Sequence, residues 1–277
     1  MKYDAWRRIK SVEKEYLNTL LRLVKIFNKI AKSSGSDQSK YVQAMRDFQN
    51  SYQYEKYIYS AVKRMVTPLE VGNMKTWRQA AKRATKGKFL YSLLMDELKQ
   101  GKDKVIQNQI IEDANLIRTL PNDVAQKVVK DIADASFKGL RAESIEKIIR
   151  DKTDQHARAS ARLIARTETA KTQSALTKAR CEELGLRWYV WRTAQDGDRV
   201  RKSHRIMEGV LVNWNNPPSP EALVGETSVG NYHAGNIWNC RCYSEPLLEI
   251  DDVQWPHKVY IDGQIKIMSK SEFAKIM

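Results

Sequence analysis

The sequence is poor in cysteine and has no long apolar run. Only three cysteines occur among 277 residues, at Cys181, Cys240 and Cys242. An odd number with one Cys-x-Cys pair does not make a disulfide framework, so we expect a reducing compartment. The start, MKYDAWRRIK, lacks an apolar core of signal-peptide length, and no later run is apolar enough to cross a bilayer. We therefore expect synthesis in a cytoplasm and no membrane partner.

Signatures of several common enzyme classes are also missing. The chain contains no glycine-rich phosphate loop, no Gly-x-Ser-x-Gly elbow and no His-Glu-x-x-His. Asp196-Gly-Asp198 resembles the start of a calcium loop, but no glutamate follows at the required position. The sequence thus offers no complete set of catalytic residues of a familiar kind.

Acidic residues are outnumbered by basic ones. The chain carries 48 Lys and Arg against 33 Asp and Glu, a formal net charge of +15. This excess predicts a polyanionic partner, either nucleic acid or an acidic protein surface, and a solvated basic surface is the alternative. The stretch from 75 to 88 has no acidic residue and is the best candidate for contacts with a phosphate backbone. Its candidate DNA-binding residues are Lys75, Arg78, Lys82, Arg83, Lys86 and Lys88, and Trp77 between them could stack on a base.

Apolar residues in the first 155 positions recur mostly at helical spacing. Leucine, valine, phenylalanine and isoleucine recur at steps of three and four in residues 4–32, and Ser33-Ser-Gly-Ser-Asp ends that helix. A second helical pattern runs from Tyr41 toward Val66, and shorter ones fill 107–149. We expect 1–155 to be a helical region that contacts DNA or a protein partner.

The pattern changes after residue 155. A helix is expected over 155–183, ending at Gly185, followed by strands near 187–193, 210–212 and 240–248. Residues 213–236 contain three prolines and should form an irregular loop. Asp262-Gly263 lies between two alternating runs, which predicts a hairpin in 251–277. The fold class is α+β: a long helical N-terminal region, then a small α/β module over 156–250 with a short antiparallel sheet and a proline-rich loop, and a C-terminal hairpin and tail.

Arg166 and Glu168 of the 155–183 helix are candidate functional residues. Arg158, Arg162 and Arg166 follow one another at four-residue steps and share one stripe. Glu168 lies on a different row of mostly small residues, where a carboxylate should be partly buried and need a partner such as Arg199 or Arg201. A buried ion pair is favoured over a general base, which would require a second converging acid or base.

A histidine and two cysteines suggest a metal site. Asp198 is suited to cap a helix over 199–207 that places Arg201 and His204 on one face and ends near Gly209. His204 with Cys240 and Cys242 supplies the ligand types that zinc prefers, although Cys-x-Cys is tighter than the usual finger spacing. His233 and Asp198 are candidates for a fourth ligand. A core histidine beside two free thiols is the alternative, so the expected cofactor is either none or zinc.

Taken in order, these residues resemble the phage Mu F-like head morphogenesis family of minor capsid proteins. The resemblance covers about residues 115–248. It depends on Ile164-Ala-Arg166-Thr167-Glu168-Thr169, the strand with Trp191, Asp198-Arg-Val-Arg201 with His204, Gly209, and Cys240-Arg-Cys242. No single piece is specific, whereas the ordered set is. The residues Arg166, Glu168, Asp198, Arg201, His204, Cys240 and Cys242 are then expected to form a structural motif rather than a catalytic one.

The resemblance implies a tailed-phage minor head protein that is not an enzyme. Its expected location is the capsid interior near the portal vertex, and the host cytoplasm during assembly. The implied partners are the portal protein, a capsid or scaffolding protein and double-stranded DNA bound without sequence preference, during genome packaging or ejection. The alternative is a metal-dependent nuclease or hydrolase that uses Asp198, His204, Cys240 and Cys242.

Overall fold

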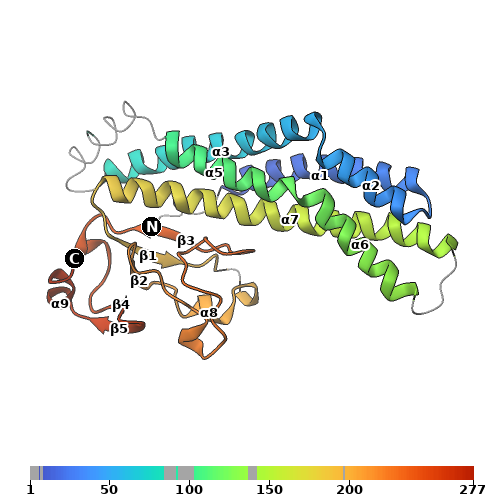
Figure 1. Cartoon of the computed structure of the whole chain (residues 1–277). Helices are drawn as coiled ribbons and strands as arrows, with labels where there is room; N and C mark the ends of the chain where they lie inside the picture. The colour runs from blue at the N-terminus through green and yellow to red at the C-terminus, as the bar shows by residue number, and fades with distance from the viewer. Residues whose placement is uncertain (1–5, 7–8, 84–91, 93–102, 137–141, 196) are drawn as a thin grey trace. The chain divides into compact units, whose positions relative to one another are not determined.

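The computed structural model describes residues 6, 9–83, 92, 103–136, 142–195 and 197–277 (Figure 1). The chain divides into two compact units, and each is assembled from separate segments. Unit 1 comprises residues 1–9, 68–106 and 169–277, and unit 2 comprises 10–67 and 107–168. Among the described helices, none combines the length and apolar character that a membrane span requires.

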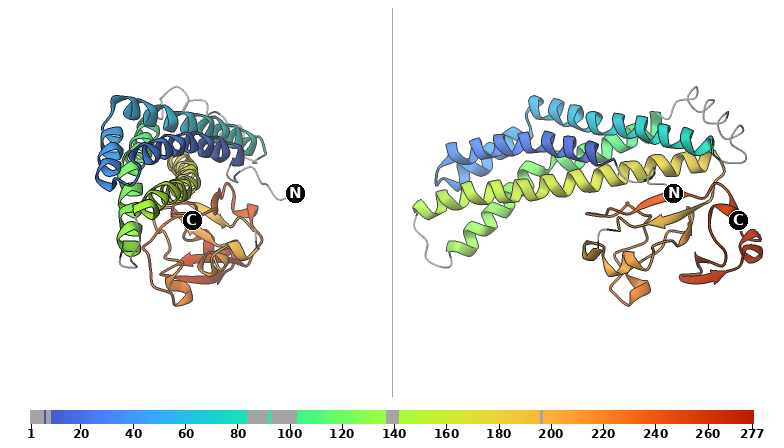
Figure 2. Two further views of the ribbon diagram at one scale, coloured as in Figure 1. Left: turned by 90° about the vertical axis from the view of Figure 1, so that its right-hand side faces the viewer. Right: turned by 180° about the vertical axis from the view of Figure 1, so that it is seen from behind.

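Unit 2 is built from helices. It contains α1 (Lys10–Ser34), α2 (Gln38–Gln49), the first part of α3 (Tyr52–Ala81), most of α5 (Asp103–Arg118), α6 (Leu120–Ser136) and the first part of α7 (Ala142–Glu183). Figure 2 shows α1 lying lengthwise beside the first parts of α3 and α7. Leu20, Val24 and Phe27 of α1 are buried, as their spacing predicts. Gly35 then takes a positive φ of 58°, and Asp37 caps α2 by accepting a hydrogen bond from the Lys40 amide.

Buried tyrosines connect the helices of unit 2 through their hydroxyl groups. Tyr41 of α2 shares a 2.7 Å hydrogen bond with Thr153 of α7, and Tyr54 of α3 donates to the carbonyl of Ile117 at 2.6 Å. These bonds satisfy hydroxyls that would be costly to bury unpaired. Tyr41 and Tyr54 therefore pack between helices. The expected single helix from Tyr41 to Val66 is two helices, because the chain breaks at Asn50 and the Ser51 hydroxyl accepts from the Tyr54 amide at the start of α3.

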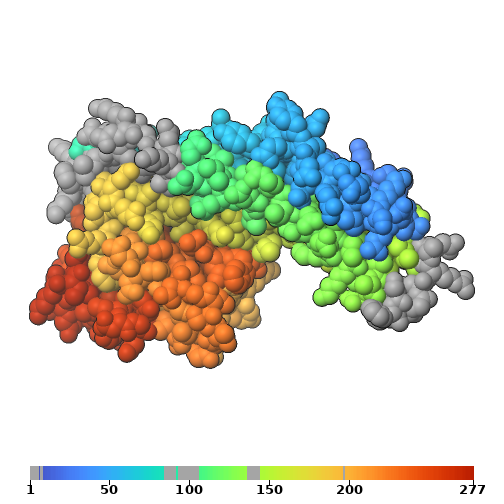
Figure 3. Space-filling view, in the orientation of Figure 1, coloured from blue at the N-terminus to red at the C-terminus, as the bar shows by residue number. Residues whose placement is uncertain are grey.

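The described residues of unit 1 form one five-stranded sheet with strand order β3-β1-β2-β4-β5. The strands are β1 (Trp188–Arg192), β2 (Leu211–Asn213), β3 (Tyr243–Pro246), β4 (His257–Ile261) and β5 (Gln264–Met268). Strand β1 pairs antiparallel with β2 and β3, while β2 pairs parallel with β4 at Leu211 and Val259. The α+β class is thus confirmed, but the sheet is mixed rather than purely antiparallel. Residues after β1, orange to red, form one continuous body in the space-filling view (Figure 3).

Strand β1 is buried on both faces of the sheet. Trp188 and Val190 pack on one face with Phe273 of α9 (Lys270–Ala274), whereas Tyr189 and Trp191 pack on the other. This division follows from the two-residue period of a strand. The second core also contains Trp77 of α3, which is 1% exposed and meets Trp6 edge to face at 4.9 Å. The expectation that Trp77 could stack on a base is therefore wrong.

Two further boundaries differ from the sequence expectations. The helix expected from residue 155 begins at Ala142, so α7 runs without interruption through the position at which we expected a domain boundary. The hairpin of β4 and β5 forms as predicted, with Asp262 and Gly263 both at positive φ. It is not a separate tail, because β4 pairs with β2 and extends the sheet.

Candidate functional site

The most chemically distinctive site of unit 1 contains His204, Cys240 and Cys242. His204 lies on α8 (Lys202–Arg205), a single helical turn that follows the 3-10 turn η2 (Gly197–Arg199). The expected two-turn helix over 199–207 is wrong, since Arg201 occupies the cap position and no side chain caps the turn. The cysteines lie in the irregular segment just before β3, after Asn239, which has a positive φ of 58°.

The three side chains converge in a buried position. Nδ1 of His204 lies 3.4 Å from Sγ of Cys242 and 3.6 Å from Sγ of Cys240. His204 is 2% exposed, Cys240 3% and Cys242 6%. One potential metal-binding atom from each residue lies within 4.8 Å of the other two. Among the residues that the structure describes, these three form the group of His, Cys, Asp or Glu side chains close enough together to hold a metal ion. The structure thus brings together residues separated by 36 positions in the chain.

The other ring nitrogen of His204 faces a buried oxygen network. Nε2 lies 2.9 Å from the Tyr232 hydroxyl, which donates to Oε1 of Glu221 at 2.6 Å. Ser203 also donates to this carboxylate oxygen at 3.3 Å. Burial and the bond to Glu221 raise the pKa of the Tyr232 hydroxyl, so it keeps its proton. Since that proton is used toward Glu221, the Tyr232 oxygen accepts from Nε2–H of His204, and the lone pair of Nδ1 faces the thiols.

The two thiols are not equivalent. A hydrogen bond from Cys242 lowers the pKa of Cys240 well below the ordinary thiol value, with His204 acting in the same direction. The hydrogen bond to Cys240, together with burial, raises the pKa of Cys242. The backbone amide of Cys242 also points at the sulfur of Cys240, at 3.4 Å. Cys240 is therefore the thiol that ionises first.

A cavity of about 120 Å³ opens beside this cluster. Its lining residues are Ala194, Arg199, Val200, Arg201, His204, Asn239, Cys240, Arg241 and Cys242. Arg201 donates from Nη2 to the carbonyl of Trp238 at 2.8 Å, and Arg241 donates to the carbonyl of Arg199 at 3.3 Å. Three arginines thus border a space next to two thiols and an imidazole. This charge favours small anions.

Neither residue considered as a fourth ligand joins the cluster. The Asp198 side chain is fully exposed and lies 3.4 Å from Arg205. His233 is buried within the irregular loop between β2 and β3, and its Nδ1 lies 3.2 Å from the Tyr189 hydroxyl. Burial lowers the pKa of His233 to about 4, with the charge of Lys178 acting in the same direction. The set Asp198, His204, Cys240 and Cys242 is therefore not assembled as a unit.

The candidate residues of α7 lie in unit 2. Glu168 is 2% exposed, which agrees with the burial expected for it. Arg166 lies 3.6 Å from Oε1 of Glu13 on α1. Burial raises the pKa of the nearby Tyr16 hydroxyl, and the charges of Asp113 and Glu168 add to that shift. Pairing of Glu168 with Arg199 or Arg201 stays a prediction.

The basic segment lies at the end of α3 in unit 1. Lys75, Lys82 and Arg83 are exposed and Arg78 is half-buried. Lys86 and Lys88 lie outside the described residues. The segment therefore presents cations to solvent, as contact with a phosphate backbone requires.

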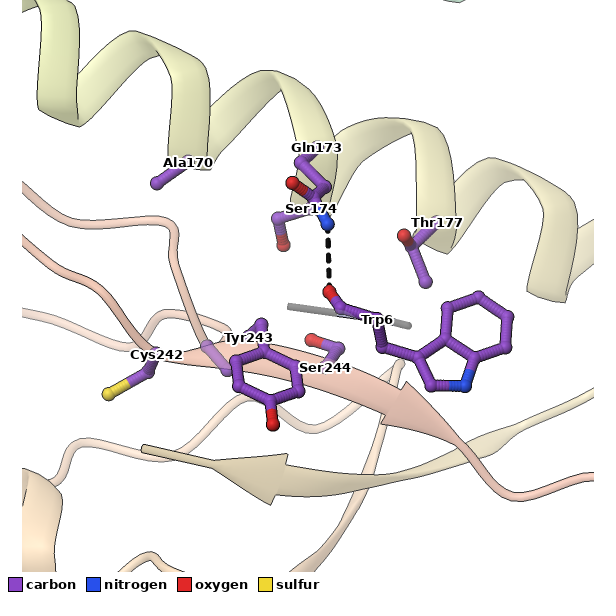
Figure 4. A pocket seen from close by; sticks show the side chains of 9 residues that line it. Trp6, Ala170, Gln173, Ser174, Thr177, Cys242, Tyr243 and Ser244 are labelled. Atoms are coloured by element: carbon purple, nitrogen blue, oxygen red, sulfur yellow. Dashed lines mark hydrogen bonds between the residues drawn. The ribbon is translucent and has the colours of Figure 1, made fainter. Parts of the chain in front are cut away.

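A second cavity, between α7 and β3, is much smaller. Figure 4 shows Gln173 of α7 donating to the carbonyl of Trp6 at 2.8 Å beside Ser174, Tyr243 and Ser244. The cavity has a volume of about 10 Å³, which is enough for roughly one water molecule. The sulfur of Cys242, which also lines it, points away from Gln173 (Figure 4). This cavity is too small for an organic ligand.

Sequence reasoning missed Tyr232 and Glu221. Both lie in the irregular segment between β2 and β3, where no periodicity relates them to His204. A glutamate beside three prolines looks like a solvated loop residue, yet Glu221 is 6% exposed. Only the folded path of that loop reveals its role.

The fold and the site together define an α+β protein with a buried imidazole–thiol cluster and a basic surface. Residues 126–245 match the family model described as phage Mu protein F like protein. The match confirms the resemblance drawn from the ordered motifs, over residues 126–245.

Comparison with individual proteins adds one relative. The chain is 30% identical over 161 residues to a protein of Haemophilus influenzae described as an uncharacterized protein. The aligned part covers 57% of this chain and 33% of that protein, so the chain spans about a third of the length of its relative. No solved structure matches.

Proposed function

We propose that this chain is a tailed-phage minor head protein that acts in head morphogenesis. The observation that carries the proposal is the match of residues 126–245 to the phage Mu F-like family. The match includes the C-terminal end of α6, all of α7 and the strands from β1 to β3, and with them the cluster of His204, Cys240 and Cys242. The buried motif then holds a small folded module together, and the chain needs no catalytic set.

The proposed location is the capsid interior beside the portal, where the chain contacts DNA during packaging or ejection. The net charge of +15 supports a polyanionic partner. The exposed cations at the end of α3 support a contact with phosphates that does not depend on sequence.

Co-expression with the portal and major capsid proteins of the same phage tests the assembly role. We expect the chain to co-purify with the portal and to be incorporated into heads in few copies. Heads assembled without the chain should package or deliver DNA poorly. The proposal is rejected if the chain binds neither protein and heads form and function equally well without it.

The DNA contact is tested by the salt dependence of binding. Changing Lys75, Lys82 and Arg83 to glutamine should weaken binding to duplexes of any sequence and reduce the slope of log affinity against log salt by about 3. The matched control changes Lys25, Lys29 and Lys32 of α1, which are also exposed, and should have a smaller effect. Equal effects of the two triple variants would place the DNA contact elsewhere.

The alternative function is a metal-dependent nuclease or hydrolase. The convergence of His204, Cys240 and Cys242 beside a cavity favours it, whereas the exposed Asp198 does not supply the expected acid. Incubation of the zinc-loaded chain with plasmid and oligonucleotide DNA distinguishes the enzyme from the structural protein. Cleavage that disappears in Cys240→Ser would support the enzyme over the structural protein.

A further inference from the structure

We propose that His204, Cys240 and Cys242 bind one zinc ion, and that the fourth coordination position opens into the arginine-lined cavity, where water or a small anion completes it. The inference concerns this cluster alone and is independent of any role in a phage head. On binding, the two thiols release their protons to solvent and ligate as thiolates, while the imidazole ligates through neutral Nδ1.

The distances fit a tetrahedral ion. A zinc ion binds sulfur at about 2.3 Å and nitrogen at about 2.0 Å. At a tetrahedral angle, the sulfur and the nitrogen are then about 3.5 Å apart. The measured separations from Nδ1 of His204 are 3.4 Å to Cys242 and 3.6 Å to Cys240. The tight Cys-x-Cys spacing is compatible with this arrangement because the sulfurs of Cys240 and Cys242 both lie close to Nδ1 of His204.

The surroundings of His204 are those of a metal ligand. A ligating imidazole usually donates its other N–H to an oxygen that fixes the tautomer and orients the ring. Here Nε2 meets the Tyr232 hydroxyl at 2.9 Å, and Tyr232 is held by the buried carboxylate of Glu221 at 2.6 Å. This partner fixes the ring so that Nδ1 faces the two sulfurs.

The sulfur of Cys240 has a comparable partner. The Cys242 amide donates to it at 3.4 Å, and backbone N–H groups aimed at sulfur stabilise metal-bound thiolates. The ligands join the turn at α8 to the approach to β3, two segments that otherwise have little regular structure. An ion here would therefore fix the irregular half of the module.

The open position follows from the composition of the cavity. Among the described residues, no other histidine, cysteine or carboxylate joins the group as a fourth ligand. Two thiolates and a neutral imidazole cancel the charge of Zn²⁺, so the nearby Arg199, Arg201 and Arg241 set the local potential. The cavity of about 120 Å³ holds water or a small anion at the ion.

Metal content and cobalt substitution test the site in the full chain. We expect one zinc per chain in protein purified without chelators. Replacement by Co²⁺ should give the visible bands of tetrahedral cobalt and a thiolate-to-metal charge-transfer band. A folded, monodisperse chain that contains no zinc and gives no cobalt bands would overturn the proposal.

Variants separate ligation from folding. Cys240→Ser and Cys242→Ser should lose stoichiometric metal, whereas Cys181→Ser, a matched change at the third buried cysteine, should retain it. Tyr232→Phe removes no ligand and should weaken zinc affinity about 10–100-fold. If circular dichroism shows that the Cys240→Ser and Cys242→Ser variants do not fold, the zinc affinity of Tyr232→Phe tests the proposal instead. Unchanged affinity in that variant would contradict the proposed role of His204.

Added thiocyanate tests the open position. We expect it to shift the visible bands of the cobalt-substituted protein, because the anion replaces water at the ion. Bands that do not respond to thiocyanate would show that the protein fills the fourth position, and the open-site part of the proposal would be wrong.

Discussion

Two buried histidines of unit 1 have different partners. His204 lies between two thiols and the Tyr232 hydroxyl, whereas His233 contacts the Tyr189 hydroxyl and the ring of Trp214 at 4.9 Å. No carboxylate contacts His233 in the described structure, so burial dominates and its pKa is lowered to about 4. His233 is thus neutral in the folded protein near pH 7.

We predict that His233 makes the protein less stable in mild acid. The unfolded chain takes up a proton at this residue below about pH 6.5, whereas the folded chain does so only near pH 4. Stability should therefore fall as pH decreases through that window, by up to roughly 3 kcal/mol. Urea unfolding at pH 7.5 and pH 5 measures the loss, and His233→Gln should lose less. An equal loss in both proteins would show that other groups are responsible.

The sequence indicated which residues could hold a metal ion, but not what surrounds them. Histidine and a Cys-x-Cys pair are recognisable because few other residues offer nitrogen and sulfur to a metal. Nothing in the residue types themselves predicts that Glu221 is buried or that His233 is excluded from the cluster. Those outcomes depend on the path of the loop between β2 and β3.

Among the elements, that loop is held by a close backbone contact at Gly235. Gly235 has a φ of 85°, and a Cβ added there would lie 3.0 Å from the carbonyl oxygen of Cys242 and 3.3 Å from that of Ala170. Since the neighbouring atoms belong to the backbone, they cannot move aside as a flexible side chain could. The absence of a side chain at Gly235 therefore helps to set the position of Cys242.

We predict that Gly235→Ala destabilises unit 1 and disturbs the candidate metal site. The control Gly225→Ala has the same left-handed strain, with a φ of 74°, but open space around the added methyl group. Crowding should make the Gly235 variant less stable than the control by about 1–3 kcal/mol. Denaturant unfolding measures the difference, and weaker cobalt binding should accompany it. Equal stabilities would mean that the backbone relaxes freely at Gly235.

The C-terminal elements are part of the core of unit 1. Phe273 of α9 is fully buried and packs edge to face against Trp188 of β1 at 4.9 Å. The sequence predicted the hairpin of β4 and β5 from its Asp-Gly turn, since turn chemistry is local. It did not predict that β4 would pair with β2, because strand pairing over 48 positions has no local signal.

We predict that Phe273→Ala costs about 3–5 kcal/mol, because it leaves a cavity against two tryptophans. Ile276→Ala, three residues later and 37% exposed, should change stability by no more than about 0.5 kcal/mol. Urea unfolding of the two variants tests this. A small effect of Phe273→Ala would mean that α9 contributes little to the core.

Over the whole molecule, chain order and compact units do not coincide. Helices α3 and α7 each supply residues to both units, and unit 1 takes in segments near the start, middle and end of the chain. A change of composition near residue 155 is visible in the sequence, but α7 passes through it because its helical spacing continues.

We predict that removal of metal lowers the melting temperature. Zinc at a thousandfold excess over its dissociation constant adds about 4 kcal/mol to stability. For a unit of this size the shift is on the order of 10 °C. All three proposed ligands lie in unit 1, so a chelator should shift the transition of that unit. Calorimetry with and without chelator measures this, and Cys240→Ser should show no shift.

Features that depend on near neighbours and on composition were predictable from the residues alone. Helical spacing gave α1, alternation gave β1, the Asp-Gly turn gave the last hairpin, and the charge gave the expectation of an anionic partner. The ordered motifs also indicated the family whose model matches residues 126–245. The burial of Trp77, the pairing of β4 with β2, and the contacts of Tyr232 and Glu221 behind His204 became evident only in the folded chain. These contacts join residues that are distant in the chain. They stabilise the fold only after the intervening segments have packed, so no local pattern in the sequence predicts them.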